Sequence, residues 1–142
     1  MSQVDFYVLK ASGEANRQRF ACRLAEKAYR LNNTVHIQVA DQQSAARLDE
    51  LLWTFRDASF VPHEVLGHAA GKPVSPVTIS SDAMPSVHCD LLINLSNSIP
   101  EAAAAFPRVA EIVTSDDESK KRSRQHFVEY RNNGHQLDSH NL

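Results

Sequence analysis

Apolar residues recur along this chain with two periods, one typical of strands and one typical of helices. Short runs rich in β-branched residues alternate with longer segments in which apolar positions return every three or four residues. The predicted strands are 4–9, 34–39, 77–79, 89–95 and 109–113. The predicted helices are about 14–31, 42–55, 101–106 and 115–133. Strand and helix therefore alternate, which predicts an α/β protein with a mainly parallel sheet and helices on its faces.

The pattern fits one domain over residues 1–134. A stretch from 56 to 76 is rich in glycine and proline and is interpreted as loop. Residues 135–142 follow Gly134, are mostly polar, and are expected to form a frayed tail. In the first helix, Phe20, Leu24, Ala28 and Leu31 are spaced to line the buried face.

The second helix carries one aromatic side chain that does not fit its apolar stripe. Asp41 is a plausible N-cap, and Leu48, Leu52 and Phe55 share one side of the helix. Trp53 falls well outside that stripe at about 100° per residue. Either another segment covers the indole, or Trp53 is half-exposed at an interface, where tryptophan is enriched among binding hot spots.

The final helix combines a predicted cap with a cluster of cations. Ser115 and Glu118 have the spacing of a capping box. Lys120, Arg124 and Phe127 stack on one strip, with Phe127 at the boundary between the strip and the core. A hydrophobic pocket edged by Lys and Arg suits an acidic peptide that ends in an apolar residue and a carboxylate. The alternative is an ordinary solvated helix face.

Composition places the chain among ordinary globular proteins. It has 142 residues, 42% of them hydrophobic and 23% charged, with a formal net charge of −2. That charge argues against a protein whose main role is to grip nucleic acid. Cys22 and Cys89 are too few for a disulfide framework and suit a reducing compartment. No secretory signal or membrane span is evident, so a cytoplasmic location is expected.

No catalytic or phosphate-binding motif is complete. The segment Gly67–Pro73 has three residues between its glycines where a Walker loop needs four, and it lacks the following Ser or Thr. No G-x-G-x-x-G follows the first strand. We therefore expect no cofactor. The alternative is a small nucleotide-binding protein or enzyme that uses Lys72 or His88.

The candidate metal and nucleophile residues are poorly spaced. His63 and His68 are five residues apart, which would turn their imidazoles away from each other on a helix. His88 and Cys89 are neighbours in a predicted strand and would point to opposite faces. No metal site and no catalytic site are expected.

Several sequence segments resemble one known family, the chi subunit of bacterial DNA polymerase III. The most specific are Arg47-Leu48-Asp49-Glu50-Leu51-Leu52-Trp53 and Ser59-Phe60-Val61-Pro62-His63. Phe6-Tyr7-Val8-Leu9, Asp90-Leu91-Leu92-Ile93-Asn94-Leu95 and Tyr130-Arg131 with Gly134 follow in the family's order. The similarity covers about residues 3–137.

The resemblance implies a Rossmann-like fold without nucleotide chemistry and a non-catalytic adaptor of the replicase. Such proteins bind the acidic C-terminal tail of single-stranded DNA-binding protein and, on another surface, the psi subunit of the clamp-loader complex. The family's tail-binding positions match Lys120, Arg124, Phe127, Val113 and Trp53, and Phe60 matches a psi-facing position. Phe127 stands where the family often has Tyr, and Ser119 and Arg122 stand where it can have Leu.

Overall fold

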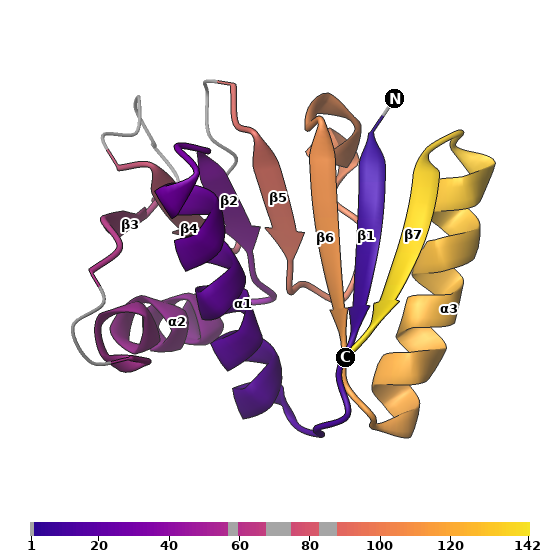
Figure 1. Cartoon of the computed structure of the whole chain (residues 1–142), viewed down its shortest axis with the longest axis horizontal. Helices are drawn as coiled ribbons and strands as arrows, with labels where there is room; N and C mark the ends of the chain where they lie inside the picture. The colour runs from indigo at the N-terminus through magenta and orange to yellow at the C-terminus, as the bar shows by residue number, and fades with distance from the viewer. Residues whose placement is uncertain (1, 57–59, 68–74, 83–87) are drawn as a thin grey trace.

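The computed structural model describes residues 2–56, 60–67, 75–82 and 88–142. Strands and helices alternate along most of the chain (Figure 1). The elements are β1 (Gln3–Val8), α1 (Glu14–Arg30), β2 (Val35–Gln38), α2 (Gln42–Thr54), β3 (His63–Val65), β4 (Val77–Ser80), β5 (Leu91–Asn94), the 3-10 helix η1 (Glu101–Ala105), β6 (Arg108–Val113), α3 (Asp117–Asn132) and β7 (Gln136–Asn141).

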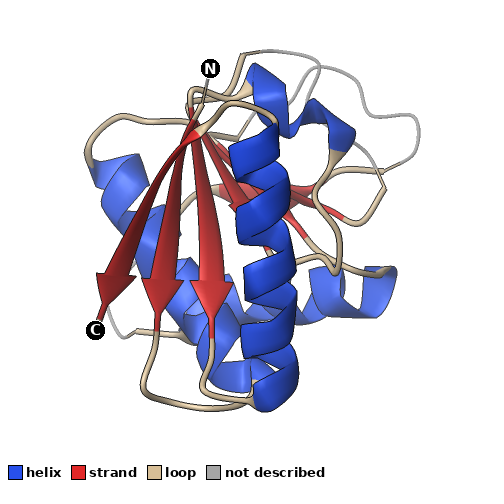
Figure 2. Cartoon of the chain, turned by 90° about the vertical axis from the view of Figure 1, so that its right-hand side faces the viewer, coloured by secondary structure: helices blue, strands red, loops and turns tan. Residues whose placement is uncertain are grey.

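One sheet contains all seven of these strands in the order β3-β4-β2-β5-β6-β1-β7. Each neighbouring pair is parallel. Helices lie on both faces of the sheet (Figures 1 and 2). The predicted α/β, Rossmann-like architecture with a parallel sheet is therefore confirmed, and the sheet is parallel throughout rather than mainly so.

The first core lies between the sheet and helices α1 and α2. Small side chains bring α1 close to the strands, with Ala21, Cys22 and Ala25 fully buried. Leu48 and Leu52 of α2 join the same core, as their spacing predicts. The predicted face of α1 is partly wrong, because Leu31 is 65% exposed. The buried stripe is instead formed mainly by the smaller residues.

The second core lies on the opposite face, beneath α3 and η1. Phe6 of β1 and Tyr130 of α3 are almost completely buried there, and their rings meet edge to face with centroids 6.0 Å apart. Val109 and Val113 of β6 belong to the same cluster. Alternate residues of β1, β5 and β6 thus serve opposite cores, which fixes the register of these strands.

The expectation of a frayed tail at residues 135–142 is wrong. Gly134 adopts a φ of +87°, which reverses the chain after α3. Residues Gln136–Asn141 then form β7, which pairs in parallel with β1 along its full length. The polar composition concealed this strand because β7 lies at the edge of the sheet and exposes most of its side chains.

The start of α3 also differs from the prediction. Asp116, not Ser115, is the N-cap residue, and no side-chain hydrogen bond caps this end of α3, so the predicted capping box does not form. The Asp116 carboxylate instead accepts bonds from the Gly13 amide at 2.9 Å and the Thr114 hydroxyl at 2.7 Å. Asp116 therefore ties the turn before α1 to the turn before α3.

Two smaller elements, β3 and η1, also differ in detail from the prediction. The short strand β3 lies within the stretch interpreted as loop, because its three residues are too few to show a period. The alanine-rich segment after Pro100 forms a helix, as predicted, and this helix is of the 3-10 type. None of the described helices is long and apolar enough to cross a membrane.

Candidate functional site: two surfaces at opposite ends of the sheet

The structure brings four of the predicted tail-binding residues together on α3 and the strand beneath it. Lys120 and Arg124 are exposed and lie one turn apart, so both project from the same side of α3. Phe127 is only partly buried and packs against Phe6, with ring centroids 5.5 Å apart. Val113 is buried in the same apolar cluster. A cationic strip therefore borders an apolar floor that is still partly accessible.

The cations of this strip are available for a partner. No ion pair within the described part of the chain engages Lys120 or Arg124. By contrast, Arg17 at the start of α1 is buried and donates to the carbonyl oxygens of Ile112 and Leu95 and to the Glu14 carboxylate. Arg17 is thus a structural cation, whereas the strip on α3 faces solvent.

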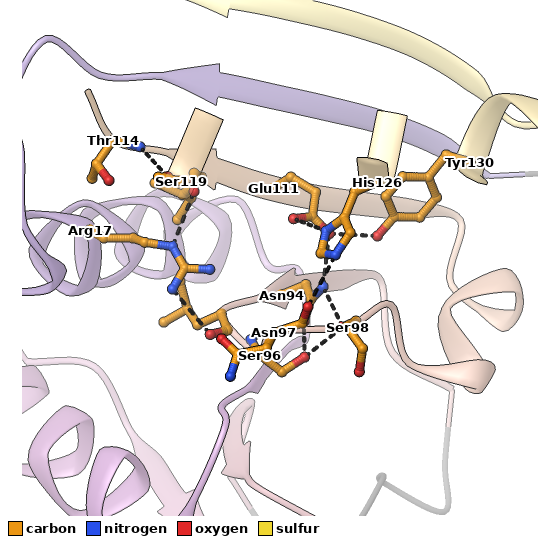
Figure 3. A network of polar contacts seen from close by, with 12 residues as sticks. Arg17, Asn94, Ser96, Asn97, Ser98, Glu111, Thr114, Ser119, His126 and Tyr130 are labelled. Carbon is orange, nitrogen blue, oxygen red and sulfur yellow. Dashed lines mark hydrogen bonds and ion pairs between the residues drawn. The ribbon is translucent and has the colours of Figure 1, made fainter. Parts of the chain in front are cut away.

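A buried polar network fixes α3 on the sheet (Figure 3). Glu111 of β6 is almost fully buried, and its carboxylate accepts hydrogen bonds from Tyr130 Oη at 2.7 Å and Asn94 Nδ2 at 2.8 Å. His126 Nδ1 lies 3.2 Å from the same carboxylate. Three polar side chains thus surround one buried carboxylate and satisfy its hydrogen-bonding capacity.

His126 of α3 contacts two oxygen atoms in this network. Its Nε2 lies 3.3 Å from the carbonyl oxygen of Asn97, so both ring nitrogens face oxygen acceptors. Only the doubly protonated imidazolium donates at both positions. Burial alone would lower the pKa of His126, but the hydrogen bond and charge of Glu111 raise it above its ordinary value. The Glu111–His126 pair therefore joins α3 to β6 and to the loop after β5.

Sequence reasoning missed this network. Its one visible signal is Glu111, a charged residue inside the otherwise apolar run Val109–Val113. A carboxylate in a strand buried on both faces requires compensation by nearby donors. The sequence does not reveal which donors provide it, because only the fold brings Asn94 of β5 and His126 and Tyr130 of α3 to Glu111.

Trp53 lies elsewhere, at the other end of the molecule. Its side chain is 51% exposed, so the half-exposed interpretation of the indole is correct. It packs against Phe60, which is 62% exposed, with ring centroids 5.5 Å apart. Helix α2 packs on β3 and β4, whereas α3 packs on β6 and β7 across the sheet (Figure 1). The expected contribution of Trp53 to the same apolar floor as Phe127 is therefore not supported.

His63 packs against Trp53, one ring of this aromatic pair. The imidazole is buried and contacts the indole of Trp53, with ring centroids 4.5 Å apart and ring planes tilted by 52°. Its Nδ1 lies 2.6 Å from the Val61 carbonyl oxygen and its Nε2 3.0 Å from that of Asp49. His63 thus holds the loop before β3 against α2. We define the exposed pair Trp53 and Phe60 as the aromatic patch.

The residues considered for catalysis do not assemble into a site. Burial raises the pKa of the Cys89 thiol, which disfavours the thiolate that a nucleophile needs. His88 is exposed and pairs with Asp90 at 3.3 Å. Within the described ranges, no group of three or more His, Cys, Asp or Glu residues could hold a metal ion. His68 and the rest of the segment 68–73, including Lys72, lie outside the described residues.

Two small cavities lie at the carboxyl ends of the parallel strands, where α/β folds often bind ligands. Their volumes are about 240 and 210 Å³, and both touch Val39, Ala40 and Asn97. Serine hydroxyls line the first cavity, and Arg17 and Arg122 line the second. Arg17 is already bonded to Glu14 and to backbone oxygens, so its guanidinium is engaged within the protein.

Comparison with known proteins gives one consistent result. The family model described as "DNA polymerase III chi subunit, HolC" matches residues 1–138. A DNA polymerase III subunit chi from Pseudomonas aeruginosa is 38% identical over 142 residues, covering 100% of this chain and 98% of the relative. The chi subunits of Haemophilus influenzae and Escherichia coli K12 are each 31% identical, covering 96% and 98% of this chain and 95% and 97% of the relatives.

Proposed function

Since the chain belongs to the DNA polymerase III chi subunit family and is thus a replication accessory subunit, we propose that it is a non-catalytic adaptor with two protein partners. One partner is the acidic C-terminal tail of single-stranded DNA-binding protein, and the other is the psi subunit of the clamp-loader complex. The proposed place of action is the cytoplasm, with the replicase. The adaptor needs no cofactor in this scheme.

The tail-binding proposal is supported chiefly by the strip on α3. Lys120 and Arg124 are exposed and unpaired among the described residues. Phe127 provides partly exposed apolar surface beside them, with Val113 buried in the same cluster. The terminal carboxylate of an acidic tail would pair with Arg124 or Lys120. Its last apolar side chain would pack against Phe127. Charge-assisted hydrogen bonds of this type contribute roughly 1.5–3 kcal/mol each.

Titration with a synthetic acidic tail peptide tests this proposal. Arg124→Ala is expected to weaken binding by roughly 10- to 100-fold, because one charge-assisted hydrogen bond is lost. Lys121→Ala is the matched control, since it removes one positive charge from a position about 100° around the helix from Lys120. Equal affinities of Arg124→Ala and the unsubstituted chain would contradict the carboxylate clamp.

The psi proposal is supported by the aromatic patch. Two adjacent half-exposed aromatic rings on a monomer are typical of interaction surfaces. Phe60→Ala is expected to weaken psi binding by at least about 10-fold while leaving tail binding unchanged. Leu31→Ala is the matched control, because Leu31 has a similar exposed fraction, 65% against 62%, at another place on the surface. Undiminished capture of psi by Phe60→Ala would refute this assignment.

A further inference from the structure

The outer edge of β7 carries backbone groups with no partner in the sheet. The amides of Gln136 and Leu142 donate to Ser2 and Val8 at the β1 side, at 3.2 and 3.0 Å. In a parallel ladder, residues alternate between facing one neighbour and the other. The N–H and C=O groups of Leu137, Ser139 and Asn141 therefore point away from β1, where β7 is the last strand (Figure 2).

Helix α3 presents its charges unevenly on its two flanks. We take the direction of Tyr130 as inward, at 0°, and count about 100° around the helix axis per residue. The angles between about 60° and 120° are then occupied by Phe127, Lys120, Arg131 and Arg124. The opposite flank holds both glutamates of the helix, Glu118 and Glu129, together with Arg122. Asp117, in the first turn, lies at about 140°. The first flank of α3 therefore carries three cations, with one acidic residue at its border. We call it the cationic flank and define it by Lys120, Arg124 and Arg131.

The cationic flank faces the same side of the sheet as the free edge. Phe127 contacts Phe6 of β1 and shares an apolar cluster with Leu137 of β7, whereas His126, on the other side of Tyr130, faces β6 and Asn97. The direction from His126 to Phe127 thus runs from β6 toward β7. Helix α3 and strand β7 also pack against each other. The cations consequently stand beside the unpaired backbone of β7.

The cationic flank of α3 and strand β7 have similar lengths. Lys120 and Arg131 are eleven residues apart, which is about 16 Å along a helix. The six residues of β7 extend over about 20 Å. Because a turn at Gly134 connects them, α3 and β7 run in opposite directions, so Lys120 and Arg124 lie toward the Asn141 end of the strand and Arg131 toward its beginning. One extended peptide of a few residues could contact both.

We infer that β7 accepts an extended acidic peptide as an eighth strand, with the peptide's carboxylates on the cationic flank of α3. This inference rests on the proposed tail binding and specifies its mode. Backbone hydrogen bonds to Leu137, Ser139 and Asn141 give affinity without requiring a particular sequence, and Phe127 and the cations select an acidic chain with an apolar end. A second copy of this chain fits less well, because pairing two β7 edges would bring two cationic flanks together.

The test removes one outward amide and measures peptide affinity by fluorescence anisotropy. In Ser139→Pro the substituted nitrogen has no hydrogen to donate, yet no bond within the sheet is lost, since that amide faces outward. The expected result is at least about a 10-fold loss of affinity for a synthetic acidic peptide with a free terminal carboxylate. Ser139→Ala keeps the amide and should bind within about twofold of the unsubstituted chain. Equal affinities of Ser139→Pro and Ser139→Ala would overturn the inference.

A second experiment uses the unsubstituted protein, and it tests strand addition even if Ser139→Pro does not fold. Two peptides of the same sequence carry N-methyl groups on alternate amides, in opposite registers. An added strand predicts that one register abolishes binding and the other preserves it. Equal affinity of both peptides, with Arg124→Ala still defective, would overturn strand addition while leaving tail binding intact. Concentration-dependent dimerisation that Ser139→Pro abolishes would assign the edge to a second copy instead.

Discussion

The two ends of the sheet offer partners different chemistry. At the α3 end, the exposed cations Lys120 and Arg124 lie beside the aromatic ring of Phe127, which is half withdrawn into the core. At the α2 end, Trp53 and Phe60 are exposed rings. The first surface suits a charged, flexible chain end, and the second suits a folded apolar partner. Separation across the sheet allows both to be occupied at once.

The two ends also differ in what holds them in place. The α3 end depends on a buried ionic network centred on Glu111. The aromatic patch depends on contacts of the buried His63 ring with Trp53 and with backbone oxygens. Damage to the buried network should therefore reach tail binding through the position of α3, and should leave the aromatic patch unaffected as long as the domain folds.

The largest effect is expected from breaking the buried ion pair. Glu111→Ala should lower the free energy of unfolding by about 3–5 kcal/mol, because it leaves a buried His126 without its anion. Urea denaturation measures this change. Glu129→Ala is the control, since that glutamate is exposed on the same helix. A loss for Glu111→Ala no greater than that for Glu129→Ala would show that the network does not anchor α3.

A smaller loss is expected when only one donor is removed. Tyr130→Phe deletes the hydroxyl that donates to Glu111 at 2.7 Å and keeps the ring that packs on Phe6. The expected cost is about 1–3 kcal/mol, the penalty for an unsatisfied buried acceptor. Tyr29→Phe in the other core should change stability by less than about 0.5 kcal/mol. Similar denaturation midpoints for the two variants would contradict the network's role.

Salt concentration should affect binding at the α3 strip more strongly than binding at the aromatic patch. The two exposed charge-assisted contacts to Lys120 and Arg124 each lose up to about 1 kcal/mol of Coulomb attraction by screening as the ionic strength rises. Tail-peptide affinity should therefore fall by about 10-fold between low and high salt. Binding at the aromatic patch should change little. Parallel titrations at several salt concentrations measure both slopes, and equal slopes would remove the distinction between the two ends.

The smallest expected effect is the change with pH in the stability that His126 contributes. The pKa of His126 is raised in the folded protein, so its stabilising contribution is complete below its unfolded value, near 6.5, and is lost as pH rises through the folded value. The melting temperature of the unsubstituted chain should therefore exceed that of His126→Gln most at about pH 6, and the difference should shrink toward alkaline pH. A difference that grows with pH would show that His126 is not the cation of the pair.

The sequence predicts the architecture and the α3 strip for clear physical reasons. Buried strands and amphipathic helices reveal themselves by period, and helical spacing alone places Lys120, Arg124 and Phe127 on one side. Strand β7 is invisible to this reasoning because both of its faces carry polar residues, and its existence follows from pairing with β1. The distance between Trp53 and Phe127 could not be predicted either, since helix angles give direction but not position across the sheet.

The measurement that most directly tests the account is the affinity for the acidic tail peptide in the absence and in the presence of saturating psi subunit. Two separate surfaces predict the same dissociation constant within about twofold in both conditions, and a ternary complex in sedimentation. Displacement of the peptide by psi would show that the strip on α3 and the aromatic patch belong to one shared site, which would contradict the account.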